Sequence, residues 1–81
     1  MNQDAQKVSV QIFGELYVIK GHRSEEHITK VAKEVDRRMK EVASKFPRLA
    51  VHQVATLVAI NLADELSKIK EEQKTVMAML E

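Results

Sequence analysis

The sequence contains no cysteine and no tryptophan, and it has one proline, two glycines, one tyrosine and two phenylalanines. The lack of cysteine excludes disulfides and thiol catalysis. With 13 Lys and Arg against 12 Asp and Glu, the formal net charge is +1, so no overall excess of charge draws the chain to nucleic acid or to an anionic membrane. Because so few aromatic rings are available to stack on bases, we expect no nucleic-acid partner.

Long apolar runs are also missing. Residues 49–63 carry the least charge, but they include His52, Gln53 and Asn61 and are fewer than the ~20 apolar residues that span a bilayer. The first residues are polar and do not have the pattern of a signal peptide. We therefore expect a cytoplasmic protein that does not insert into membranes.

A chain of 81 residues predicts one small domain. A core of this size only about offsets the entropy of ordering the chain, so we expect stabilisation by self-association. The chain is too short to enclose an active-site pocket, and it has no Gly-rich phosphate loop or nucleophile elbow. Its histidines, His22, His27 and His52, lack metal-ligand spacing. We expect a non-enzymatic protein with no cofactor and no metal.

Residues 8–19 predict a β-hairpin, because apolar and polar residues alternate on either side of Gly14. A two-residue type II′ turn at Gly14 and Glu15 would pair Val10 with Ile19. A two-stranded ribbon is barely stable alone, so we expect one of its faces to pack on a helix and the second face to be open to another subunit. One face carries Val8, Val10, Ile12, Tyr17 and Ile19, and the other carries Phe13, Leu16 and Val18.

An amphipathic helix is predicted over residues 24–46. Ser24 is a favourable N-cap residue, and Pro47 ends the helix. Apolar residues recur along it at helical spacing and form one stripe. The stripe comprises Ile28, Val31, Ala32, Val35, Met39, Val42, Ala43 and Phe46.

The face opposite this stripe is basic. Four cations fall within one sector of ~80°, and Arg38 lies near its edge. Two interpretations stay open: an electrostatic docking surface for an acidic protein, doubled by dimerisation, or a solvated face with i,i+4 pairs such as Glu34–Arg38 and Asp36–Lys40. We call the four cations the basic ridge: Lys30, Lys33, Arg37 and Lys40.

A long helix is predicted over residues 49–81, which contain no Gly or Pro. It is apolar nearly all round as far as residue 63, and beyond that it keeps one apolar stripe among charged residues. Nothing else in the chain is left to cover the stripe, so we expect an intermolecular coiled coil; a helix packed within its own domain is the alternative. We call the stripe the seam: Ala55, Ala59, Leu62, Leu66, Ile69, Gln73, Val76 and Leu80.

These elements predict an oligomeric α+β fold with an N-terminal β-hairpin, an amphipathic helix and a long C-terminal helix that forms the coiled coil. We expect a disordered or frayed N-terminus over residues 1–7, a globular head over residues 8–63 and a coiled-coil extension over residues 64–81.

Three strings in this order resemble one family. They are VSVQIFGELYVI at 8–19, HITKVAKEVDRRMKEV at 27–42 and VATLVAINLADELSKIK at 54–70. Together they resemble the bacterial cell-division protein family ZapA in its short Bacillus-type form. The resemblance covers about residues 7–75.

The resemblance implies a non-enzymatic partner of the tubulin-like GTPase FtsZ at the mid-cell division site. Such a protein forms homodimers and dimer-of-dimers homotetramers, bundles FtsZ protofilaments, stabilises the division ring and lowers FtsZ GTP turnover. The resemblance also implies that charged head residues contact FtsZ, here Lys33, Arg37, Arg38 and Lys40, with Glu15 after the turn glycine. Longer relatives often carry a basic residue where this chain has Glu15. The alternative function is a coiled-coil dimeric scaffold that docks a different acidic protein through the basic ridge.

Overall fold

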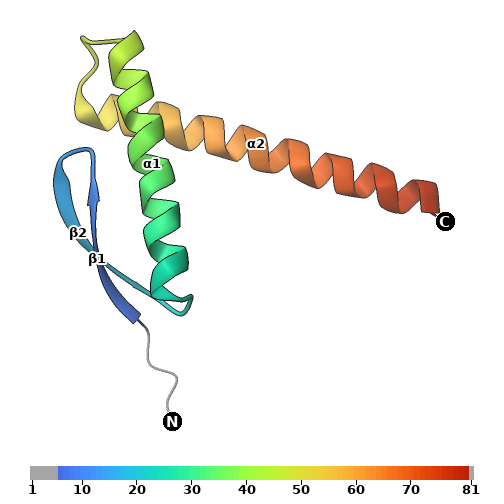
Figure 1. Ribbon diagram of the computed structural model, residues 1–81. Helices are drawn as coiled ribbons and strands as arrows, with labels where there is room; N and C mark the ends of the chain where they lie inside the picture. Colours follow the sequence, from blue (N-terminus) through green and yellow to red (C-terminus); the bar gives the residue numbers. More distant parts are fainter. Residues whose placement is uncertain (1–5, 81) are drawn as a thin grey trace. The chain divides into compact units, whose positions relative to one another are not determined.

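A computed structural model describes residues 6–80 of the chain (Figure 1). Two strands are followed by two helices, in the order β1 (Gln6–Ile12), β2 (Glu15–Gly21), α1 (Glu25–Lys45) and α2 (Val51–Leu80). This is the predicted α+β order. The chain divides into two compact units, of which the first ends at Arg48 and the second begins at Leu49.

The ends of the elements lie close to those predicted. Strand β1 starts at Gln6, and the first five residues of the expected frayed segment 1–7 lie outside the described residues. Helix α1 is one residue shorter at each end than the predicted 24–46. Helix α2 begins at Val51, and the predicted last helical residue, Glu81, lies outside the described residues.

The predicted type II′ turn is wrong. Ile12 pairs with Glu15, so the turn residues are Phe13 and Gly14, and Val10 pairs with Tyr17 instead of Ile19. Phe13 and Gly14 have φ values of 51° and 84°, and positive φ at both positions is the mark of a type I′ turn.

The correction leaves the predicted faces of the hairpin unchanged. A shift of register by two residues keeps every side chain on its side of a strand. Val8 and Val10 are accordingly buried against Ile28 and Ala32 of α1. The described core of the first unit therefore joins β1 to α1, and α1 lies along the hairpin in Figure 1.

Helix α1 is capped as predicted. Ser24 has extended backbone angles, and its Oγ accepts a hydrogen bond from the N–H of His27 at 3.1 Å. Of the predicted apolar stripe, Ile28, Ala32 and Met39 are buried, whereas Val31 and Phe46 are exposed. Val31 lies at the margin of the stripe. Phe46 is the C-cap residue, and because its φ of −131° and ψ of 72° are not helical, the helical spacing no longer places its side chain on the buried face.

Helix α2 changes character along its length. The Oε1 of Gln53 accepts a hydrogen bond from the N–H of Ala50 at 3.0 Å, which satisfies a backbone donor at the start of the helix. Val54 and Val58 are buried, but every described residue from Ala63 to Leu80 is exposed. This change falls where the sequence pattern changes, and the predicted boundary between head and coiled coil at 63–64 stays a prediction.

Candidate functional site

The basic ridge occupies one side of α1. At ~100° per residue, Lys33, Arg37 and Lys40 lie within ~60° of one another around the helix. Arg38 lies ~100° beyond Arg37, and its side chain is 20% exposed where that of Arg37 is 58% exposed. Three of the four predicted α1 contact residues therefore share one face, and Arg38 lies beside it.

Glu34 holds both arginines by charge-assisted hydrogen bonds. Arg37 binds it with two nitrogens, Nε at 3.2 Å from Oε1 and Nη2 at 2.7 Å from Oε2. Arg38 donates from Nε to Oε2 at 2.7 Å, which is the predicted i,i+4 pair. The hydrogen bonds from Arg37 and Arg38 lower the pKa of Glu34 to about 2, and the same carboxylate raises the pKa of Arg37.

Asp36 pairs with the last member of the ridge and also with the hairpin. Its Oδ2 lies 2.9 Å from Nζ of Lys40, the second predicted i,i+4 pair. Its Oδ1 accepts a hydrogen bond from the N–H of Phe13 at 2.7 Å. The hydrogen bonds from Lys40 and from the Phe13 backbone lower the pKa of Asp36 below its usual value.

The contact between Asp36 and Phe13 holds the turn that precedes Glu15 against α1. Glu15 is exposed and forms the closing pair of the turn with Ile12, directly after Phe13 and Gly14. Sequence reasoning missed the role of Asp36, because it joins residues 23 apart in the chain. The available signal was an Asp at the edge of the apolar stripe, a position where a short acceptor can reach a neighbouring backbone.

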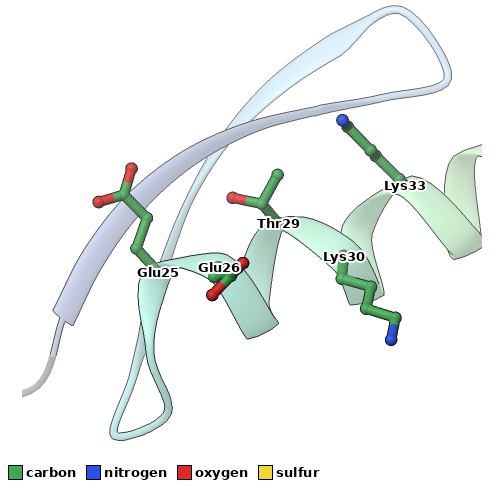
Figure 2. Close-up of a pocket in the computed structure, with 5 residues that line it drawn as sticks. All are labelled: Glu25, Glu26, Thr29, Lys30 and Lys33. Carbon is green, nitrogen blue, oxygen red and sulfur yellow. The ribbon is translucent and has the colours of Figure 1, made fainter.

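The first turns of α1 form a shallow, open hollow of mixed charge (Figure 2). Lys30 and Lys33 point to different sides of the helix in this view. Within residues 6–80 neither lysine has an ion-pair partner, in contrast to Arg37 and Lys40. The hollow is a charged surface on one helix and is not an enclosed pocket. Its lining residues are Glu25, Glu26, Thr29, Lys30 and Lys33.

The seam lies along one face of α2. At ~100° per residue its eight positions fall within a sector of ~100°. Leu62 is half-buried, while Leu66, Ile69 and Val76 each remain about half exposed. A shallow apolar hollow lies along the same face, lined by Ile69, Glu72, Gln73, Val76 and Met77. The remaining seam positions, all exposed, are Ala55, Ala59, Gln73 and Leu80.

The histidines and Asn61 form no site in the described residues. No group of three or more His, Cys, Asp or Glu side chains in that part of the chain is placed to hold a metal ion. Asn61 is exposed, so its amide is not buried without a partner. Across residues 6–80, neither helix is long and apolar enough to cross a membrane. The described surfaces offer charge on α1, apolar area on α2, and exposed apolar side chains on β2, where Leu16 and Val18 are 72% and 65% exposed.

Comparison with known proteins identifies relatives over nearly the whole chain. The family model described as "Cell division protein ZapA" matches residues 8–81. A cell division protein ZapA of Geobacillus kaustophilus is 42% identical over 78 residues, covering 96% of this chain and 86% of the relative. One from Geobacillus sp. (strain WCH70) is 38% identical over 78 residues, covering 96% and 90%.

A solved structure has the same fold. The structure titled "ZapA mutant dimer from Geobacillus stearothermophilus" is 40% identical in sequence and superposes with a TM-score of 0.80. The match covers 99% of this chain and 93% of that one. It confirms the predicted order of hairpin, amphipathic helix and long C-terminal helix.

Proposed function

The chain belongs to the ZapA family of cell division proteins, and from this premise we propose that it binds FtsZ, cross-links FtsZ protofilaments into bundles and stabilises the division ring at mid-cell. It does so without catalysis, as a homodimer that can pair into a tetramer. Slower GTP turnover by FtsZ follows from bundling. The observation that carries the proposal is that one short chain presents two separate exposed surfaces, the basic ridge and the seam.

Cross-linking requires both surfaces. A single head decorates one filament, whereas two or four heads joined through the seam hold two filaments at once. The second contact then benefits from the effective concentration that the first one sets, and no new type of contact is needed. The Geobacillus stearothermophilus structure is titled a dimer, which supports self-association of this chain, and the seam is the surface that we propose for it.

The ridge suits an acidic partner although two of its four cations, Arg37 and Lys40, are already paired. Arg37 and Lys40 are 58% and 66% exposed, and their bonds to Glu34 and Asp36 link residues of the same helix. Exposed ion pairs typically contribute ~0.2–1 kcal/mol, so a protein carboxylate can compete for these cations. Lys33, which has no ion-pair partner in the described part of the chain, is available without such an exchange. Arg38 and Glu15 are proposed as flanking contacts.

The test is sedimentation and light scattering of FtsZ polymerised with GTP, with and without this protein. Reversing two ridge charges, Arg37→Glu and Lys40→Glu, is expected to weaken FtsZ binding about tenfold or more, because like charges would then face the acidic partner. The matched control reverses Lys68 and Lys74, which lie on α2 away from the seam and give the same change in net charge.

The outcomes separate the contact from the function. If bundling is lost in the ridge variant but kept in the control, the result supports both FtsZ bundling as the function and the basic ridge as the contact. Bundling that survives the ridge reversal retains the function and moves the contact to another part of the head. If the wild-type protein does not sediment with FtsZ, the FtsZ proposal is refuted, and a scaffold for a different acidic protein takes its place.

A further inference from the structure

Phe13 occupies a backbone position that the type I′ turn requires and that a phenylalanine seldom adopts. It is the one non-glycine residue with positive φ, 51°, among the described residues. A bulky side chain seldom adopts this left-handed conformation, because Cβ approaches neighbouring backbone atoms. The ladder closes at Ile12 and Glu15, so the N–H of Phe13 has no partner in the sheet.

Asp36 supplies the missing partner. Its Oδ1 accepts the Phe13 N–H at 2.7 Å, and its Oδ2 lies 2.9 Å from Nζ of Lys40. The Asp36 side chain is only 22% exposed, so this contact is partly shielded from water. One carboxylate therefore binds both the tip of the hairpin and a cation of the basic ridge.

The position of Asp36 on α1 determines where on the helix the hairpin tip is bound. At ~100° per residue, Asp36 lies between the buried positions Ala32 and Met39 on one side and the ridge cations Lys40 and Lys33 on the other. The hairpin tip is thus held at the border of the ridge. The core contacts of Val8, Val10 and Ile12 hold the strands on α1, and the hydrogen bond from Phe13 to Asp36 adds a contact that fixes the turn itself.

We propose that Asp36 is a positioning residue of the partner-binding surface, which fixes the hairpin tip beside the basic ridge so that the tip and the ridge contact the partner as one rigid surface. This inference rests on the proposed function, in which the ridge binds FtsZ. A surface that is ordered before binding loses less entropy on association, so the link raises affinity without itself touching the partner.

A double-mutant cycle tests the inference. Glu15→Lys adds a positive charge at the tip, and because the ridge selects an acidic surface, FtsZ affinity is expected to rise about threefold in the wild-type background. In the Asp36→Ala background the tip is no longer held, and the same change is expected to raise affinity less than about 1.5-fold. If Asp36 only stabilises the fold, the gain is the same in both backgrounds, because independent sites contribute additively.

A conservative variant separates the hydrogen bond from the charge. Asp36→Asn keeps an acceptor oxygen for the Phe13 N–H but loses the charge that faces Lys40. It is expected to keep most of the gain from Glu15→Lys and slow hydrogen exchange at the Phe13 amide by NMR. Asp36→Ala is expected to exchange faster at that amide. If Asp36→Ala does not retain the helical circular dichroism of the wild type, Asp36→Glu replaces it, because it keeps the charge and displaces the carboxylate by one methylene.

Each result decides the question. A smaller gain in FtsZ affinity from Glu15→Lys in the Asp36→Ala background, together with faster hydrogen exchange at the Phe13 amide, supports the positioning role. An equal gain, with the wild-type protein bound to FtsZ, overturns this inference and leaves the proposed function intact. If the wild-type protein does not bind FtsZ, the proposed function is refuted and the positioning role falls with it.

Discussion

Replacing Leu66 by Lys is expected to separate bundling from head binding. The Leu66 side chain is 53% exposed in the single chain, so about half of it is available for burial by a partner. Full burial of a leucine contributes ~1.5–3 kcal/mol, so half contributes ~0.8–1.5 kcal/mol. A dimer loses this twice, ~1.5–3 kcal/mol, which raises its dissociation constant ~10–150-fold before the cost of a buried charge is added.

The assay pairs sedimentation equilibrium of the protein with light scattering of FtsZ polymers. Light scattering is expected to fall at protein concentrations where the Leu66→Lys variant still sediments with FtsZ. A single head still binds one filament, but it is no longer joined to a second head that could bind another filament. Ser67→Lys is the matched control. It adds the same charge to the same exposed segment, but it lies ~100° further round the helix and away from the seam.

Either of two results would refute the reasoning about the seam. If Leu66→Lys has the dissociation constant of the wild type and bundles FtsZ normally, the seam does not form the bridge. If Ser67→Lys weakens assembly as much as Leu66→Lys does, the effect comes from charge and not from lost apolar contact.

Two further predictions concern the head. Gly14→Ala is expected to lower the free energy of unfolding by ~1–2 kcal/mol. The cost comes from the backbone, since φ is 84° at Gly14, and not from a clash, since an added Cβ would meet no atom within 4 Å. Chemical denaturation measures the change, and a loss of stability no larger than that caused by Gly21→Ala would contradict the prediction. Glu34 is expected to titrate near its lowered pKa of about 2, so its stabilising pairs with Arg37 and Arg38 are fully present above pH 4.5 and are lost as the pH falls through about 2. Carboxyl-carbon NMR follows this titration, and a midpoint near 4.5 would refute the pairing.

The order of the elements could be predicted because each has a local signal. Alternation marks the hairpin, helical spacing marks α1 and α2, and Ser24 caps α1 through a residue three positions away. The membership of the ridge follows from the same helical geometry, and so do the pairs Glu34–Arg38 and Asp36–Lys40.

The turn could not be predicted in the same way. Glycine suits both the first position of a type II′ turn and the second position of a type I′ turn, so Gly14 alone does not decide between them. The structure has the second arrangement, in which Phe13 takes a left-handed conformation with its N–H bound to Asp36. That contact joins residues 23 apart, and no local pattern reports it.

The identity of the protein that binds the basic ridge could not be predicted from the residues alone, for a different reason. Charges at Lys33, Arg37 and Lys40 specify an acidic surface but no particular protein. The link to FtsZ comes from the family relationship, and the contact residues, including Arg38 and Glu15, stay predictions.

The exposure of α2 has a consequence for protein dosage. The hairpin and α1 bury side chains against each other within one chain, including Val8 and Ile28, so these contacts do not require a second copy. The described residues from Ala63 to Leu80 are all exposed and have no buried side chain in the single chain. A helical segment gains most of its stability from packing of its apolar face, so this segment depends on a second copy. Stability that a second copy supplies follows mass action and is lost on dilution. Bridging should then increase more steeply than in proportion to the number of molecules in the cell, while filament decoration follows that number directly.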